Sequence, residues 1–278
     1  MIELCRQAAS INLQSSIRRG NVLYLPDSGR VVFAGDIHGH RRNFERTVAF
    51  ADLAARPDTH LILHEILHGG PEDELGGCLS FQLYEEVLRL QIQFPQQVHL
   101  LLGNHDTAVI NDTDVMKCGK EMNQAMKAAM KRHFAEEFED TLQAMRDYLV
   151  TQPLAARAPN RIWMSHSLPE DRYLDKFDPG ILGRTLTPED CRRGNSGYLM
   201  TWGRHHGEAT LEKIAQMLDA DYFLLGHQPQ PSGWHRGGKN LLILASDHNH
   251  GCIISFELDK LWRMETLIDR IVPLASIE

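Results

Sequence analysis

Short runs of apolar residues alternate along the chain with longer stretches whose apolar residues recur every three or four positions. The runs Val31 to Gly35, Leu61 to Leu63 and Val98 to Gly103 have the length and composition of buried strands. The stretches 43–55 and 81–94, which lie between them, have the spacing of amphipathic helices. This alternation predicts an α/β fold in which the strands are parallel.

The second half of the chain continues this pattern. Residues 161–166, 221–227 and 240–247 form three more apolar runs that end in polar residues. A stretch from about Lys120 to Leu149 carries methionines and other apolar residues on one helical stripe. It predicts a long helix facing the core, with an adaptable docking face as the alternative. The C-terminal segment 252–267 predicts a closing hairpin around Asp259 and Lys260. No repeat or low-complexity linker is present, so we expect a single domain over residues 1–278, with a helical insertion at about 112–150.

Residues able to bind metal ions follow five of the apolar runs directly. Open α/β sheets place their ligand sites beyond the carboxyl ends of the strands, so we expect these residues to converge although they are far apart in sequence. They are Asp36, His38, Glu65, Asn104, His105, His166 and His227.

Each of these residues is ambiguous when taken alone. Asp36 and His38 are two positions apart, so both can face one ion in an extended segment, but a turn with a capping aspartate has the same sequence. A single histidine at a strand end is commonly structural. Together, oxygen and nitrogen donors without a thiolate suit manganese, iron or zinc. Their number suffices for two divalent ions that share a carboxylate, an arrangement found in enzymes that cleave phosphate esters.

Four ordered motifs resemble those of the calcineurin-like metallophosphoesterases. They are GDIHG at 35–39, GNHD at 103–106, SHS at 165–167 and GHQP at 226–229, and the resemblance extends over about residues 31–247. The GHQP form is similar to the branch that contains phosphoprotein phosphatases and symmetrical dinucleoside tetraphosphate hydrolases. The resemblance implies a four-layer α-β-β-α sandwich of two central sheets flanked by helices.

The resemblance also implies a role for each matching position. Asp36 and His38 would bind the first ion, and His105 would be the general acid that protonates the leaving oxygen. Trp202-Gly203-Arg204 is similar to an element of this branch that supplies a phosphate-binding arginine, here Arg204; the alternative is a solvated loop charge. The second ion would be bound by Asn104, His166 and His227.

The family's second motif, G-D-x-x-D-R-G, is altered in this chain, where residues 64–70 read HEILHGG. Glu65 stands at the position of the bridging aspartate, and His68 replaces the aspartate that orients the general acid. Asp106 is the alternative orienting residue. Gly69 replaces a phosphate-binding arginine, for which Arg41 can substitute unless it belongs to a surface helix.

The favoured function is hydrolysis of a phosphomonoester or phosphoanhydride by a hydroxide shared between two divalent ions, in an enzyme similar to Ser/Thr protein phosphatases. A nucleotide or dinucleoside polyphosphate hydrolase is the alternative within the same class. The altered second motif also supports a catalytically impaired relative that acts as a metal-holding binding module. A zinc- or iron-binding protein without phosphate chemistry is a further alternative.

Composition narrows the partners. The formal net charge of -8 argues against a nucleic-acid polymer as partner and leaves a phosphorylated protein or nucleotide as substrate. The five cysteines are widely spaced, which favours free thiols in a reducing compartment. The chain has no apolar leader and no candidate membrane span, so we expect a cytoplasmic protein without a membrane partner.

Overall fold

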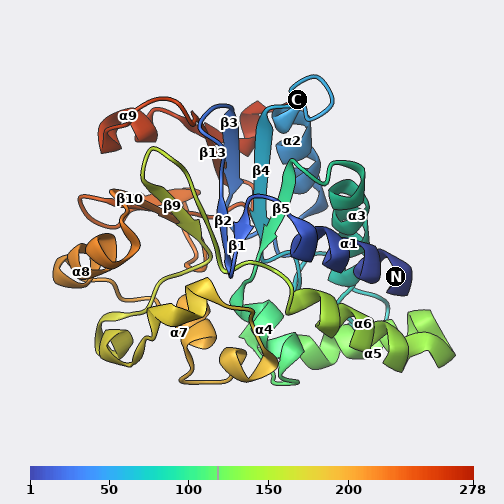
Figure 1. The fold of residues 1–278 in the computed structure, drawn as a ribbon. Helices are drawn as coiled ribbons and strands as arrows, with labels where there is room; N and C mark the ends of the chain where they lie inside the picture. Colours follow the sequence, from blue (N-terminus) through green and yellow to red (C-terminus); the bar gives the residue numbers. More distant parts are fainter. Residues whose placement is uncertain (118) are drawn as a thin grey trace.

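The computed structural model describes residues 1–117 and 119–278, and two β-sheets stand at its centre with helices on either side (Figure 1). The larger sheet has the strand order β1 (Arg18–Arg19), β2 (Val22–Tyr24), β8 (Ala155–Arg157), β9 (Ile162–Ser165), β10 (Tyr222–Leu225), β12 (Leu241–Leu244), β11 (Trp234–Arg236). The smaller sheet has the order β14 (Ile271–Pro273), β13 (Cys252–Glu257), β3 (Arg30–Ala34), β4 (Thr59–His64), β5 (Val98–Leu101).

The strands predicted from the apolar runs form the parallel centre of each sheet. Strands β3, β4 and β5 are parallel neighbours, and so are β9, β10 and β12. Antiparallel strands lie towards the edges: β13 pairs with β3, and β11 pairs with β12. The carboxyl ends of the parallel strands therefore lie at one edge of each sheet.

Alternate residues along the strands face different layers, which explains why the apolar runs are continuous. Val31 and Phe33 of β3 pack against residues of the larger sheet such as Leu224 and Leu244. Val32, the residue between them, belongs to the core that includes the helices. Strands that are covered on both faces need apolar side chains at every position. The predicted four-layer α-β-β-α sandwich is confirmed.

The helices cover the outer faces of the sheets. In Figure 1, α1 and α3 lie on the side of β5, and α8 lies on the side of β10. The predicted helices at 43–55 and 81–94 correspond to α2 and α3, and α2 stops early because Asp52 adopts a left-handed conformation with φ 50°. The helices are α1 (Ile2–Gln14), α2 (Arg41–Ala51), α3 (Ser80–Gln93), α4 (Asn104–Ile110), α5 (Met122–Phe134), α6 (Phe138–Leu149), α7 (Ser196–Trp202), α8 (Glu208–Leu218) and α9 (Met264–Ile268). Short 3-10 segments are η1 (Ala135–Glu137), η2 (Asp171–Lys176), η3 (Pro179–Gly183), η4 (Pro188–Cys191) and η5 (Leu274–Ser276).

The stretch from Lys120 to Leu149 is two helices rather than one. The chain breaks after α5 at Ala135, whose φ of 47° and ψ of -114° cannot continue a helix, and α6 begins after η1. The methionine stripe faces the core as predicted, because Met126, Met130 and Met145 have no exposed surface. Ahead of α5, a small hairpin is formed by β6 (Met116–Lys117) and β7 (Lys120–Glu121).

The prediction of a tight C-terminal hairpin around Asp259 and Lys260 is wrong. Strand β14 does pair antiparallel with β13, but the connection between them contains α9. Apolar side chains in the connection explain this. Met264 and Leu267 are buried in the core between the sheets, so the chain folds back over that core before it pairs.

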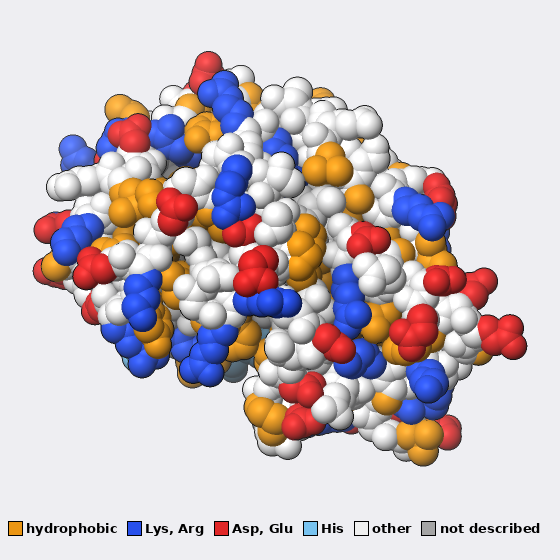
Figure 2. Space-filling model, turned by 60° about the horizontal axis from the view of Figure 1, so that its bottom comes forward, with side chains coloured by type: hydrophobic (Ala, Val, Ile, Leu, Met, Phe, Trp, Pro, Cys, Tyr) orange, Lys and Arg blue, Asp and Glu red, His pale blue; other side chains and the backbone are white. Residues whose placement is uncertain are grey.

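Cys5, Cys78, Cys191 and Cys252 are buried free thiols, as predicted, and Cys118 lies outside the described residues. Among the described residues, no helix is both long and apolar enough to span a bilayer. The face turned forward in Figure 2 carries lysine, arginine and acidic side chains interspersed. That face therefore has no continuous basic surface of the kind that binds nucleic acid.

Candidate metal centre

Five strand ends bring the predicted metal ligands into one cluster. Asp36 and His38 follow β3, Glu65 follows β4, Asn104 follows β5, and the two remaining histidines follow strands of the other sheet, β9 and β10. The cluster therefore lies where the carboxyl edges of the two sheets meet. Its six members are residues of low exposure, at most 9%: Asp36, His38, Glu65, Asn104, His166 and His227.

One half of the cluster surrounds the imidazole of His166. Its Nε2 atom lies 2.9 Å from Oδ1 of Asn104, 3.2 Å from Oε2 of Glu65 and 3.1 Å from Nδ1 of His227. His227 Nδ1 is in turn 3.0 Å from Asn104 Oδ1. Two imidazole nitrogens, one amide oxygen and one carboxylate oxygen thus lie close together. An imidazole nitrogen carries at most one hydrogen atom, so hydrogen bonds cannot satisfy all of these contacts at once.

The other half contains His38 and Asp36, and Asp36 also faces the first half, since its Oδ1 atom lies 3.6 Å from Nδ1 of His166. Nε2 of His38 lies 3.6 Å from Oδ2 of Asp36, and its Nδ1 is held by the carbonyl of Leu67 at 2.9 Å. Ligand atoms of His38, Glu65 and His105 lie within 4.8 Å of one another. A ring nitrogen fixed by a carbonyl leaves the opposite nitrogen free to bind a metal ion, an arrangement common among metal-binding histidines.

Burial shifts the pKa values of this cluster in the direction that a bound cation would reverse for the carboxylates. Burial raises the pKa of Asp36 to about 7 and raises the pKa of Glu65 well above its usual value. Burial also lowers the pKa of His38 to about 4 and that of His166 well below its usual value. The bare site therefore disfavours both charged forms, and its histidines are neutral, as ligands must be. A donor set of carboxylate, amide and imidazole groups without thiolate fits divalent manganese, iron or zinc.

The backbone of the cluster is strained where the ligands leave their strands. His38, Glu65, His68 and His227 all have positive φ values between 44° and 66°. Such conformations are costly for residues other than glycine and occur at functional sites. A close approach adds to this, because a Cβ atom at Gly103 would clash with the Glu65 carboxylate. The turns therefore contain strained backbone conformations that orient these side chains towards the cluster.

Glu65 projects into the middle of the cluster. Its carboxylate accepts the backbone N–H of His105, with distances of 3.1 and 3.3 Å to the two oxygens, and one oxygen also faces His166. His166 belongs to one half of the cluster and His105 contacts the other, so the carboxylate is placed between the halves. This is the location at which a bridging ligand would be needed.

The altered second motif also supplies the neighbour of His105. Nδ1 of His68 lies 2.7 Å from Nδ1 of His105, and both rings are buried. Asp106 has a different contact, since its Oδ2 atom accepts the N–H of Gly103 and caps α4. Of the two orienting residues considered from the sequence, His68 is the one in contact with the His105 ring.

The two predicted substrate-binding arginines have different positions. Arg204 follows α7, and its charge partly offsets the rise that burial causes in the pKa of Asp36 and adds to the lowering that burial causes in the pKa of His227. Its neighbour Trp202 has its ring 6.4 Å from that of His227. Arg41 instead begins α2, is exposed and forms an ion pair with Glu86. Its placement matches the surface-helix alternative.

Three residues of the site were missed in the sequence. His64, the last residue of β4, places Nδ1 3.0 Å from Nδ1 of His166 and 3.4 Å from Oδ1 of Asp36. Lys117, in β6, and Asp247, beyond β12, form an ion pair of 3.5 Å, and both charges act on Asp36 and His38. The motifs gave no signal for His64 because the family has glycine there. Lys117 lies in the insertion, outside every motif.

Comparison with family models identifies one family. The model of the family described as calcineurin-like phosphoesterase matches residues 29–231. A probable serine/threonine-protein phosphatase of Encephalitozoon cuniculi is 22% identical in an alignment of 249 residues that covers 83% of this chain. The chain spans about half the length of that relative, 50%.

Solved structures show the same fold. A protein serine/threonine phosphatase from Saccharomyces cerevisiae, described as similar to human phosphatase PP5, superposes with a TM-score of 0.64 at 14% identity, over 91% of this chain and 81% of that one. A cold-active protein-tyrosine phosphatase of a Shewanella species gives a TM-score of 0.60 at 16% identity, over 95% and 84% of the two chains.

Proposed function

Because the chain belongs to the calcineurin-like phosphoesterase family, we propose that it is a dinuclear metal-dependent phosphatase that hydrolyses phosphomonoesters, with phosphoserine and phosphothreonine side chains as its substrates. The convergence of oxygen and nitrogen ligands from five strand ends carries this proposal. The probable serine/threonine-protein phosphatase among the relatives supports the choice of substrate.

In this proposal, Asp36 and His38 would hold the first ion, and Glu65 would contribute its carboxylate to both ions. The second ion is held by Asn104, His166 and His227. Divalent ions bound there would supply Lewis-acid stabilisation of the phosphate and activation of a water molecule. Manganese, iron and zinc all suit this donor set.

The chain's own residues bind the phosphate and move the proton. Arg204 has a guanidinium group that can contact two phosphoryl oxygens and offset the negative charge that grows on them. His105 has its Nδ1 atom against His68, which leaves Nε2 as the atom that carries the proton to the leaving oxygen. An aspartate at position 68 would stabilise the protonated ring, whereas an imidazole does not. We therefore expect slower proton donation than in relatives that have the aspartate.

Hydrolysis of p-nitrophenyl phosphate by protein loaded with Mn²⁺, Fe²⁺ or Zn²⁺ tests the proposal, together with metal content by mass spectrometry. The wild type should turn over substrate with metal and lose activity after chelation. His105→Ala should keep its metal and lose about 10²-fold or more in rate, the range for a general acid. Metal-loaded wild type that hydrolyses no phosphoester would instead support a metal-holding binding module.

A further inference from the structure

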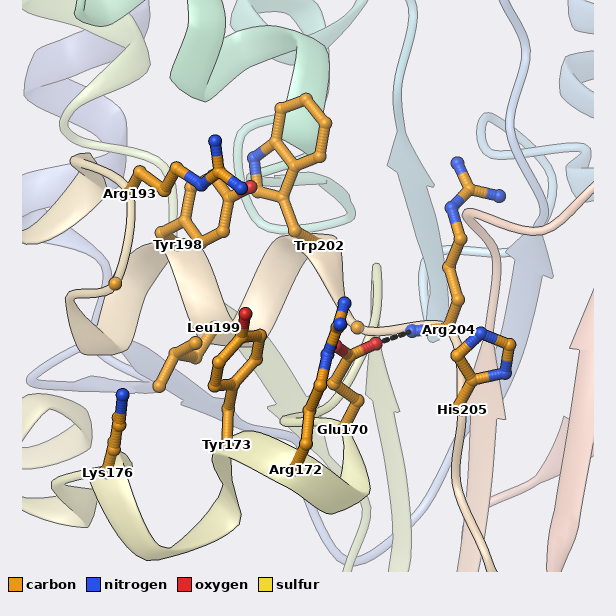
Figure 3. A pocket seen from close by; sticks show the side chains of 12 residues that line it. Glu170, Arg172, Tyr173, Lys176, Arg193, Tyr198, Leu199, Trp202, Arg204 and His205 are labelled. Atoms are coloured by element: carbon orange, nitrogen blue, oxygen red, sulfur yellow. Dashed lines mark hydrogen bonds and ion pairs between the residues drawn. The ribbon is translucent and has the colours of Figure 1, made fainter.

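A cavity of about 420 Å³ opens next to the metal centre, between η2 and α7. Figure 3 shows its side chains, which come from Glu170 and η2, from the segment between η4 and α7 that carries Arg193, from α7 and from the segment that follows α7. Trp202 lines this cavity, and its ring centroid lies 6.4 Å from that of His227, so the cavity and the metal centre are adjacent. We call it the basic pocket and define it by Arg172, Tyr173, Lys176, Arg193, Tyr198 and Arg204.

The pocket carries an excess of positive charge in a chain whose net charge is -8. Glu170 is the acidic residue in its wall, and it already pairs with Arg172 and accepts the backbone N–H of Arg204 at 3.3 Å. Across residues 1–117 and 119–278, no carboxylate lies within ion-pair distance of Lys176, Arg193 or Arg204. Unpaired cations around a cavity favour an anionic ligand.

The aromatic rings of the pocket contact its cations or stack on one another. The guanidinium carbon of Arg172 lies 4.8 Å from the centre of the Tyr173 ring, and Nζ of Lys176 lies 5.5 Å from it. The rings of Tyr198 and Trp202 stack on one another with centroids 5.1 Å apart and an angle of 11°. Since protein groups already occupy ring faces, the pocket offers a ligand positive charge rather than a stacking platform for a nucleotide base.

We propose that the basic pocket binds an acidic residue of a phosphoprotein, a few positions along the chain from the phosphorylated residue that occupies the metal centre. The proposal rests on the phosphatase function proposed above and narrows its substrates to phosphorylated sites with acidic flanks. Arg204 contacts the phosphate at one end of the pocket. Lys176 and Arg193, exposed at the other end, pair with the flanking carboxylate.

Three phosphoserine peptides that differ only in their flanking residues, glutamate, alanine or lysine, test the proposal. With manganese-loaded enzyme, we expect kcat/KM for the glutamate peptide to exceed that for the lysine peptide by about 5- to 10-fold, as two exposed ion pairs would give. The double variant K176E/R193E should reverse this preference, and K176Q/R193Q should nearly abolish it. Thermal melting confirms that both variants are folded.

Arg192→Glu is the matched control. Arg192 neighbours Arg193, is exposed and pairs with Glu189 outside the pocket, so this variant should keep the wild-type preference. An unchanged peptide ratio in K176E/R193E, or an equal change in R192E, would overturn the proposal. So would a wild type that does not distinguish the peptides but hydrolyses a nucleoside triphosphate in a manner dependent on Lys176 and Arg193.

Failure of the phosphatase function gives a different result. An enzyme that hydrolyses neither p-nitrophenyl phosphate nor any peptide would contradict the proposed function. The pocket is then tested by fluorescence anisotropy with the labelled peptides, where tighter binding of the glutamate peptide, lost in K176E/R193E, supports it. Equal binding of all three peptides would overturn it.

Discussion

At the scale of single residues, Glu65 departs from the family pattern at the centre of the site. Its side chain is one methylene longer than that of aspartate, and its carboxylate reaches the backbone N–H of His105 and the ring of His166. The absence of a side chain at Gly103 leaves room for that carboxylate. The longer side chain is thus accommodated by contacts on both sides, so the site preserves a carboxylate at its centre despite the substitution.

Exchange of Glu65 tests this assignment. Glu65→Asp keeps a carboxylate, so we expect it to retain metal and to keep or raise the hydrolysis rate, because aspartate restores the family residue. Glu65→Ala leaves the two halves of the cluster without a shared ligand and should lose both metal and activity. Metal content after gel filtration and p-nitrophenyl phosphate turnover measure both effects. Glu86→Ala, which removes an exposed partner of Arg41, is the control. Metal content indifferent to Glu65→Ala would show that the second motif is wrongly aligned.

At the scale of elements, the sequence predicts strands better than it predicts connections. The central strands are buried on both faces, so their apolar runs reveal them, and a predicted ligand follows β3, β4, β5, β9 and β10 at the carboxyl end. The break at Ala135 follows from a local conformation that the apolar stripe does not encode, because the stripe continues through it. The C-terminal connection was misread because Met264 and Leu267 are buried by contacts distant in sequence. His64 was overlooked since it ends an apolar run and belongs to no motif.

The β6–β7 hairpin is an element whose role the sequence did not indicate. Lys120 fastens it to the loop before α3 through Glu72 at 2.7 Å, and Lys117 at its other strand faces Asp247 at 3.5 Å. Burial raises the pKa of Asp36 and of Glu65, and the charge of Lys117 partly offsets this rise. The hairpin therefore holds a cation beside the cluster, in a chain whose second motif has glycine, Gly69, in place of a phosphate-binding arginine.

We expect Lys117 to assist phosphate binding from this hairpin. Lys117→Ala should raise KM for p-nitrophenyl phosphate and weaken inhibition by inorganic phosphate by about 10-fold, the effect of losing one charged hydrogen bond. Its metal content should equal that of the wild type. Lys127→Ala, which removes an ion pair with Asp112 away from the cluster, is the matched control. If phosphate inhibits Lys117→Ala as strongly as it inhibits the control, Lys117 does not contact the substrate.

At the scale of the whole molecule, the buried histidines connect stability to pH. The pair His60 and His99 lies at the amino end of β4 and on β5, away from the metal centre, with Nδ1 of His60 3.0 Å from Nε2 of His99. Burial lowers the pKa of His60 to about 4, partly offset by Asp58, and burial together with His60 lowers the pKa of His99 to about 3. Both rings are therefore neutral in the folded protein over most of the acidic range.

This pair should make the protein less stable in acid. A histidine in the unfolded chain takes up a proton below about pH 6.5, whereas these two stay neutral until about pH 4 and 3, so the unfolded state binds more protons in between. Stability should therefore fall as the pH drops from 6.5 to 4, with each histidine contributing up to about 1.4 kcal/mol per pH unit.

The histidines of the metal centre act in the same direction, so the pair is isolated by comparing the wild type with H60V/H99V at equal metal content. Urea unfolding at pH 7.5 and pH 5 should show a smaller loss of stability in the double variant. An identical loss in both proteins would mean that the pair is already protonated when folded, and the acid sensitivity would then belong to the metal centre alone.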